Sequence, residues 1–187
     1  MAPNPSHLTN LISHDGLKDS LTGLMSFPAF LESANRQLAA AVRDQKSVNL
    51  FLISLLDSST PIRSLVVRNE SRIDSLTEAE SLELSARVLL VANEIEKQFR
   101  SNDLISRYTL TDFLIMNSGT FPIIEEKIVH ALASFDVVHV GIEIRAGETP
   151  AKPHAPRETL PQLIAVLEEK VLALTLPTDP NHSQLSQ

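Results

Sequence analysis

The chain of 187 residues carries 16 Lys and Arg against 23 Asp and Glu, which gives a formal net charge of −7 at pH 7. Its basic residues are scattered, and this disfavours a nucleic-acid-binding protein, because neutralising phosphates requires clustered Lys and Arg. The chain has no cysteine, which excludes disulfides, a thiolate nucleophile and thiolate metal ligands.

The first part of the chain predicts a flexible start, a helix and a buried strand. Residues 1–14 are expected to be flexible, and the opening MAPNPSH, residues 1–7, lacks the charged and apolar regions of a signal peptide. Ser26 is suited to be the N-cap of a helix with Pro28 in its first turn. Residues 48–56 are apolar on both alternations, as in a strand buried on both faces. Because this run is far shorter than the roughly 20 residues that cross a bilayer, we expect a cytoplasmic protein without membrane insertion.

The middle of the chain predicts a loop followed by a long helix. Residues 57–80 are polar and show no sustained period, so we expect a long loop with a short element near residues 62–67. Residues 78–99 have the apolar spacing of an amphipathic helix. The stripe expected to pack on the core consists of Leu82, Ala86, Leu89, Ala92, Ile95 and Phe99.

Helices and strands alternate through the rest of the chain. This order predicts an α+β sandwich of the ferredoxin-like or polymerase-palm kind. We expect one domain over residues 15–175 and a disordered polar tail at 176–187. The remaining elements are two short strands around residues 109–112, a helix near 123–133, a strand at 137–144 and a flexible proline-rich connector at 146–161. The last is a helix from about Pro161 to Leu174 that packs through Leu163, Val166, Leu167, Val171 and Leu174.

Several motifs resemble those of one protein family. The hexapeptide DSLTGL, residues 19–24, resembles the D-x-L-T-G-L motif that opens GGDEF domains, the bacterial diguanylate cyclases that make cyclic di-GMP from two GTP. Residues 88–95 fit the apolar positions of the family's L-x-x-V-A-x-x-L helix, and VGIEI around Gly141 is similar to its S-I-G-I-A strand. The resemblance covers residues 15–174 and implies a central, mostly antiparallel sheet flanked by helices.

The signature that gives this family its name is almost entirely replaced. By the resemblance, G-G-D/E-E-F falls on the run Thr109-Leu110-Thr111-Asp112-Phe113, in which only the phenylalanine is retained. The family's glycines permit a positive φ and a close approach of the backbone to the nucleotide, which Thr and Leu cannot reproduce without strain. We therefore expect the floor of the nucleotide site to be lost.

The family's metal-binding positions are also replaced. The acid of the signature that binds metal corresponds to Thr111, and the second metal-binding aspartate corresponds to Ser54 or Leu55, depending on the register. Ser26 stands where the family has Asn. Because phosphoryl transfer depends mainly on electrostatic stabilisation by such groups, we expect no diguanylate cyclase activity, no cofactor and no bound metal.

One ligand site of the family is retained by its spacing. Many of these enzymes carry an inhibitory product site, R-x-x-D, and Arg100 and Asp103 stand at the expected distance before the signature. The resemblance implies that the Arg100 guanidinium contacts a phosphate or guanine while Asp103 accepts from guanine N–H groups. The alternative is a solvated charge pair at a helix end. The second basic residue of such a site would be Lys127 or His130.

Two hypotheses about function follow. In the first, the protein is a catalytically inactive signalling protein that acts as a scaffold or adaptor, and it contacts protein partners through helix faces, the 57–80 loop or homodimerisation. In the alternative, it is a receptor that binds cyclic di-GMP at Arg100 and Asp103. A third possibility is a residual nucleotide hydrolase that uses Asp57 and Asp112. The histidines show no metal-ligand spacing, so they suggest no further site.

Overall fold

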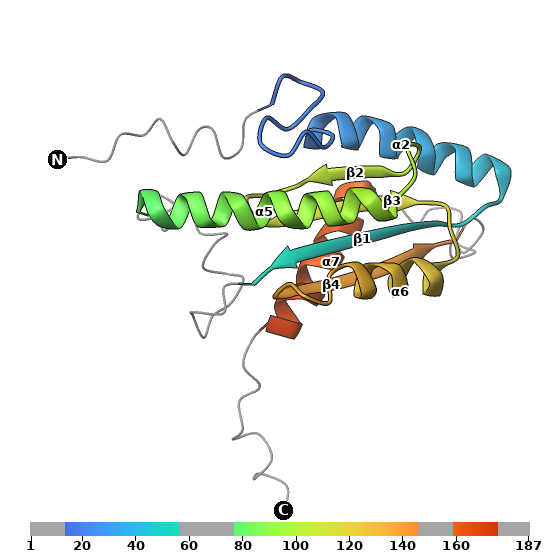
Figure 1. Ribbon diagram of the computed structural model, residues 1–187. Helices are drawn as coiled ribbons and strands as arrows, with labels where there is room; N and C mark the ends of the chain where they lie inside the picture. Colours follow the sequence, from blue (N-terminus) through green and yellow to red (C-terminus); the bar gives the residue numbers. More distant parts are fainter. Residues whose placement is uncertain (1–13, 57–76, 146–158, 176–187) are drawn as a thin grey trace, which may run out of the picture.

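The computed structural model describes residues 14–56, 77–145 and 159–175, and it shows a sheet with helices on both of its faces (Figure 1). The expected element near residues 62–67, most of the 146–161 connector and the two ends of the chain lie outside these residues. The described elements are, in chain order, α2 (Phe27–Asp44), β1 (Val48–Leu55), α5 (Glu78–Gln98), β2 (Leu104–Arg107), β3 (Asp112–Asn117), α6 (Phe121–Ala131), β4 (Val137–Ile144) and α7 (Leu160–Thr175).

The four-stranded sheet has the order β2-β3-β1-β4, and every neighbouring pair is antiparallel. Strand β1 is central, so that its Ser54 lies opposite Asp112 of β3 on one side and Val138 of β4 on the other. Every residue of β1 is buried, because helices cover both faces of the sheet. The predictions of a doubly buried central strand and of an antiparallel α+β fold are confirmed.

Alternate residues of β1 face two separate hydrophobic clusters, as the two-residue period of a strand requires. Phe51 and Ile53 pack in the cluster that contains the buried residues of α5 and α6. Leu50 and Leu52 pack in the cluster that contains those of α2 and α7. Figure 1 shows the same layering, with α5 and α6 in front of the sheet and α7 behind it. The protein is thus a three-layer sandwich with a core on each side of the sheet.

Polar caps set the residues at which helices begin. Ser26 is the N-cap of α2, as predicted, and its hydroxyl accepts a backbone N–H of the first turn at 3.4 Å. Thr77 and Glu80 form a capping box at the start of α5. Helix α6 begins at Phe121, two residues earlier than predicted, with Pro122 in its first turn. A proline is tolerated there because the first backbone N–H groups of a helix have no partner within it.

The prediction of the core-facing stripe of α5 is partly wrong. Ala92 and Ile95 are buried as expected, but Leu82 is 72% exposed and Ala86 also faces solvent. The helix is apolar on two sides, and the 3.6-residue period alone cannot decide which side meets the sheet. The residues that α5 buries are Ser81, Val88, Val91, Ala92 and Ile95.

The expected core face of α7 requires a similar correction. Val166 and Leu174 are 38% and 63% exposed, whereas Leu160 and Ile164 are buried instead. The helix starts at Leu160, one residue before the predicted start, and this turn packs into the cluster shared with α2. Leu163, Leu167 and Val171 are buried as predicted, so the rotation of the helix differs only slightly from the expectation.

Candidate functional site

The DSLTGL motif forms a compact turn beside strand β2. The Asp19 carboxylate accepts hydrogen bonds from the backbone N–H and the hydroxyl of Thr22, both at 2.7 Å through Oδ2. Gly23 has a φ of +71°, a conformation that glycine adopts without steric cost. A backbone bridge between Met25 and Ser106 attaches the end of the turn to β2. The motif therefore fixes the N-terminal loop against the β2–β3 hairpin.

Asp19 also contacts a buried arginine of that hairpin. Arg107 Nη1 lies 3.4 Å from Asp19 Oδ1, and Arg107 Nη2 donates to the Leu110 carbonyl at 3.0 Å. The two side chains of the pair are 1% and 6% exposed. Burial lowers the pKa of Arg107, and the negative charge of Asp19 opposes that change. The sequence analysis did not single out Arg107, because no local pattern distinguishes it from a solvated strand residue.

Hydroxyl groups of β1 and of the hairpin itself hydrogen-bond to Asp112 at the tip of the β2–β3 hairpin. Ser54 of β1 donates to Asp112 Oδ1 at 2.5 Å, and the Thr109 hydroxyl donates to Asp112 Oδ2 at 2.7 Å. The Tyr108 backbone N–H donates to the Asp112 carbonyl at 2.7 Å. Asp112 is 1% exposed, so its carboxylate holds the tip together instead of facing solvent. Of the two candidates for the second metal position, Ser54 is the residue opposite Asp112.

The other expected catalytic positions have structural roles or supply no charge. Thr111 is 3% exposed, and its neutral side chain replaces the charged oxygen ligands that a divalent cation beside a triphosphate requires. Ser26 donates its hydroxyl to the Gly16 carbonyl at 2.9 Å in addition to capping α2. Asp57 lies outside the described residues. Across residues 14–56, 77–145 and 159–175, no group of three or more His, Asp or Glu is arranged to hold a metal ion.

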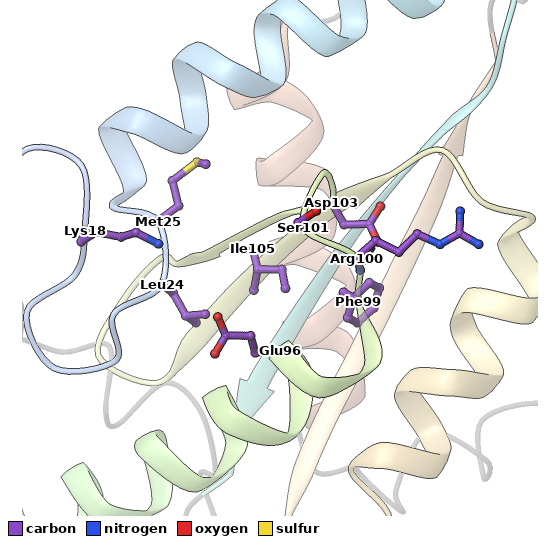
Figure 2. Close-up of a pocket in the computed structure, with 9 residues that line it drawn as sticks. All are labelled: Lys18, Leu24, Met25, Glu96, Phe99, Arg100, Ser101, Asp103 and Ile105. Atoms are coloured by element: carbon purple, nitrogen blue, oxygen red, sulfur yellow. Dashed lines mark hydrogen bonds between the residues drawn. The ribbon is translucent and has the colours of Figure 1, made fainter.

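Arg100 and Asp103 border a cleft of about 250 Å³ between the N-terminal loop and the end of α5 (Figure 2). One wall comes from the loop, and the opposite wall comes from α5 and the turn that follows it. Ile105 of β2 also lines the cleft. The complete lining is Lys18, Leu24, Met25, Glu96, Phe99, Arg100, Ser101, Asp103 and Ile105.

The two residues of the R-x-x-D motif close the turn between α5 and β2. The Arg100 backbone N–H donates to Asp103 Oδ2 at 2.9 Å, and the Asp103 N–H donates to the Arg100 carbonyl at 3.0 Å. The Arg100 guanidinium extends away from Lys18 and the loop wall (Figure 2). One carboxylate oxygen of Asp103 is therefore used by the turn itself, and the Arg100 side chain must rotate to contact a ligand inside the cleft.

Besides Arg100, the basic residue that lines this cleft is Lys18. The predicted candidates, Lys127 and His130, lie on α6, and neither is among the residues that line this cleft. Lys18 reaches the cleft because the N-terminal loop bridges to β2 through Met25. Sequence reasoning missed this residue, since Lys18 and Asp103 are distant along the chain and only the docked loop brings them to one site.

This architecture is similar to solved structures, although no match is found by sequence. No protein-family profile matches the sequence, and no curated protein matches it. Many solved structures do match. The GGDEF domain of DgcB from Caulobacter crescentus, in complex with c-di-GMP, superposes with a TM-score of 0.59 at 14% identity, and the match covers 88% of each chain. The protein has the fold of a GGDEF domain.

Two further structures support the same fold. The GGDEF domain of FimX from Pseudomonas aeruginosa matches with a TM-score of 0.60 at 14% identity, over 84% of this chain and 92% of that one. Diguanylate cyclase SiaD from the same organism, in complex with its activator SiaC, matches with a TM-score of 0.60 at 17% identity. That match covers 84% of this chain and 57% of SiaD. At such identities the comparison establishes the GGDEF fold alone.

In this fold, the run Thr109 to Phe113, which the resemblance matches to the family signature, lies in the β2–β3 hairpin, and Arg100 and Asp103 lie in the turn that leads into it. The tip is stabilised by hydrogen bonds within the protein, while the R-x-x-D turn borders an open cleft.

None of the helices in the described ranges is both long enough and apolar enough to cross a membrane.

Proposed function

We propose that this protein is a non-catalytic GGDEF-fold domain of cyclic di-GMP signalling that acts as a protein-interaction scaffold or adaptor. The observation that carries the proposal is the outer side of α5, where Leu82 and Leu90 are 72% and 56% exposed. A helix that is apolar on two sides is typical of a buried position, yet here one side contacts the sheet and the other faces solvent. The proposal takes these two leucines as part of an interaction surface.

The closed hairpin tip supports the absence of catalysis. Asp112 accepts from the Ser54 and Thr109 hydroxyls and is 1% exposed, so its carboxylate is engaged within the protein and is not presented to a bound nucleotide. The position next to it is Thr111, which offers a neutral oxygen. A triphosphate and its divalent cation would therefore lack the carboxylates that stabilise the charge of the transition state.

The absence of catalysis is tested by incubating the full chain with GTP and either Mg²⁺ or Mn²⁺. Cyclic di-GMP and the products of GTP hydrolysis are then separated by chromatography. We expect no product above the level of a sample without protein. Turnover that disappears in Asp112→Asn would refute the non-catalytic proposal, and release of GDP or GMP would point to the nucleotide hydrolase.

The interaction role is tested by photo-crosslinking in cells. A photoreactive amino acid at position 86, on the outer side of α5, is expected to give covalent adducts of higher mass. The matched control is the same amino acid at Ala39, an exposed alanine on α2. An adduct with any protein, including a second copy, supports an interaction module. A lack of adducts at position 86, with the protein folded, would contradict it.

A second candidate function is binding of cyclic di-GMP at the cleft that contains Arg100 and Asp103. The observation that favours it is their common placement with Lys18 and Phe99 around one opening. A cation can contact a phosphate, and an aromatic ring can stack on a base. DgcB, a protein with the same fold, was solved with c-di-GMP.

Isothermal titration calorimetry with cyclic di-GMP tests this candidate, with GTP as a parallel titration. We expect micromolar binding of cyclic di-GMP alone, abolished in Arg100→Ala and retained in Arg36→Ala, which removes an exposed arginine of α2. The absence of heat with either nucleotide would eliminate the receptor hypothesis and leave the interaction module in place.

A further inference from the structure

The two edge strands of the sheet, β2 and β4, differ in how the chain covers them. They lie at opposite margins of the sheet (Figure 1). Strand β2 has only four residues, and the N-terminal loop lies along it, since the Met25 N–H donates to the Ile105 carbonyl at 3.1 Å. Strand β4 has eight residues, and most of them are half-buried, whereas every residue of the central strand β1 is buried. Because a long edge strand is a template for further strand pairing, β4 is the edge at which the sheet can be extended.

The hydrogen-bond register shows which backbone groups of β4 point outward. The Leu56 N–H donates to the Asp136 carbonyl at 2.9 Å, in the register that also pairs β1 with β4. Because the bonds of an antiparallel ladder alternate, the even-numbered residues of β4 bond to β1, and the odd-numbered residues direct their N–H and C=O groups away from it. The outward N–H of Val137 donates to the Phe135 carbonyl at 3.1 Å. In the part of the chain that the structure describes, no hydrogen bond occupies the outward backbone groups of the next three, His139, Gly141 and Glu143.

These three residues can pair completely with the same three residues of a second copy. In antiparallel pairing about a two-fold axis at Gly141, His139 of each copy lies opposite Glu143 of the other. Every outward N–H of the three residues then meets a C=O of the other copy. The neighbouring registers would instead place Val137 opposite Glu143, or Arg145 opposite His139. The N–H of Val137 is already used and Arg145 lies beyond β4, so the register centred on Gly141 satisfies the outward groups best.

The polar side chains of β4 complement each other in this register. His139 of one copy and Glu143 of the other lie side by side on one face of the sheet, where an imidazole N–H can donate to a carboxylate. Within its own chain, Glu143 contacts Arg145 through Oε2 at 2.9 Å, which leaves Oε1 to accept from the second copy. The two glycines that meet at the axis bring no side chains into contact.

The opposite face of β4 is apolar and equally self-complementary. Its residues are all β-branched, the type that pairs well across neighbouring strands. The register places Val138 opposite Ile144 of the other copy and Val140 opposite Ile142. These positions form the pairs without backbone hydrogen bonds, in which side chains lie closest.

We propose that β4 of a second copy of this chain pairs antiparallel with β4 about a two-fold axis at Gly141, so that the two sheets become one continuous sheet. A two-fold interface requires a surface that complements itself, and both the backbone register and the side chains of β4 meet this condition. The inference goes beyond the proposed function, because that function rests on the outer side of α5 and this interface lies at the edge of the sheet.

The lack of cysteine in the chain permits a direct test of the register. In this pairing, the Cα atoms of Val138 and of Ile144 in the other copy are about 4.5 Å apart, which a disulfide can join. The two copies of Val138 are separated by about 20 Å, from the rise of about 3.4 Å per residue. Under mild oxidation, we expect a disulfide-linked dimer from a mixture of Val138→Cys and Ile144→Cys chains, and none from either chain alone. A crosslink in either single variant, or none in the mixture, would contradict this register.

Sedimentation equilibrium of the full chain measures the association itself. We expect concentration-dependent dimerisation that Glu143→Pro weakens about tenfold or more, because proline removes an outward N–H from each copy. The fold should tolerate this proline, since that N–H points away from β1. Glu143→Ala is the matched control, because it keeps the N–H and should weaken the dimer less. A chain that stays monomeric, or a dimer that Glu143→Pro leaves unchanged, would overturn the proposal.

Leu82→Glu, on the outer side of α5, separates this proposal from the proposed interaction function. It should leave the β4 dimer unchanged while reducing the photo-crosslinked adducts at position 86. A dimer that Leu82→Glu disrupts would place the interface on α5 and refute pairing through β4. A monomeric chain that still gives adducts at position 86 would exclude the β4 dimer and preserve the interaction function.

Discussion

Replacing Asp19 by Asn removes the charge that faces the buried Arg107. The side chains of Arg107 and Asp19 are 1% and 6% exposed, so water cannot solvate the guanidinium once the carboxylate is neutral. Removing one partner of a buried ion pair costs about 3–5 kcal/mol, because the other charge stays buried without compensation. Asn keeps an oxygen that can accept from Thr22, so the turn itself is perturbed little. We expect the free energy of unfolding, from urea titration followed by circular dichroism, to fall by that amount.

Two controls separate the buried pair from a general effect of charge. Glu32→Gln breaks an exposed pair with Arg36, whose side chains are 72% and 67% exposed, and should cost less than about 0.5 kcal/mol. The double variant Asp19→Asn with Arg107→Met removes both buried charges and should be more stable than Asp19→Asn alone. The ion-pair reasoning is refuted if Asp19→Asn lowers the free energy of unfolding no more than Glu32→Gln does. It is also refuted if the losses of unfolding free energy caused by Asp19→Asn and Arg107→Met simply add in the double variant.

Two further substitutions and one titration test the fold. Gly141→Ala should destabilise by about 1–3 kcal/mol in the same titration, since a Cβ there would meet the rings of Phe51 and Phe121, and an unchanged midpoint would contradict this packing. Thr77→Ala removes the capping box of α5 and should cost about 1 kcal/mol by thermal unfolding, whereas no change would mean that the cap contributes nothing. Hydrogen bonds from the backbone N–H of Lys18 and, with a smaller effect, of Leu17 hold the pKa of Asp15 below its ordinary value. The Asp15 carboxylate therefore contributes stability above its pKa in the unfolded chain, and this contribution is lost as pH falls through its pKa in the folded protein. A pKa of Asp15 at the ordinary value, measured by NMR titration of the carboxyl groups, would refute this prediction.

The cleft illustrates how far the sequence could go toward a site. Arg100 and Asp103 are three positions apart, and a local spacing of this kind is visible without coordinates. Lys18 belongs to the same cleft only because the N-terminal loop bridges to β2. A contact between distant segments leaves no periodic signal in either of them.

The sequence alone determined the elements and the class of fold. Apolar residues on both alternations from Val48 to Leu55 specify a strand buried on both faces. Ser26 before Phe27 specifies the start of a helix, because helix capping depends on neighbours in the chain. Tertiary structure alone decided which side of α5 meets the sheet, because both of its sides are apolar. It also decided the partners of Asp19 and Asp112, since those hydrogen bonds join segments that only the packing of the sheet brings together.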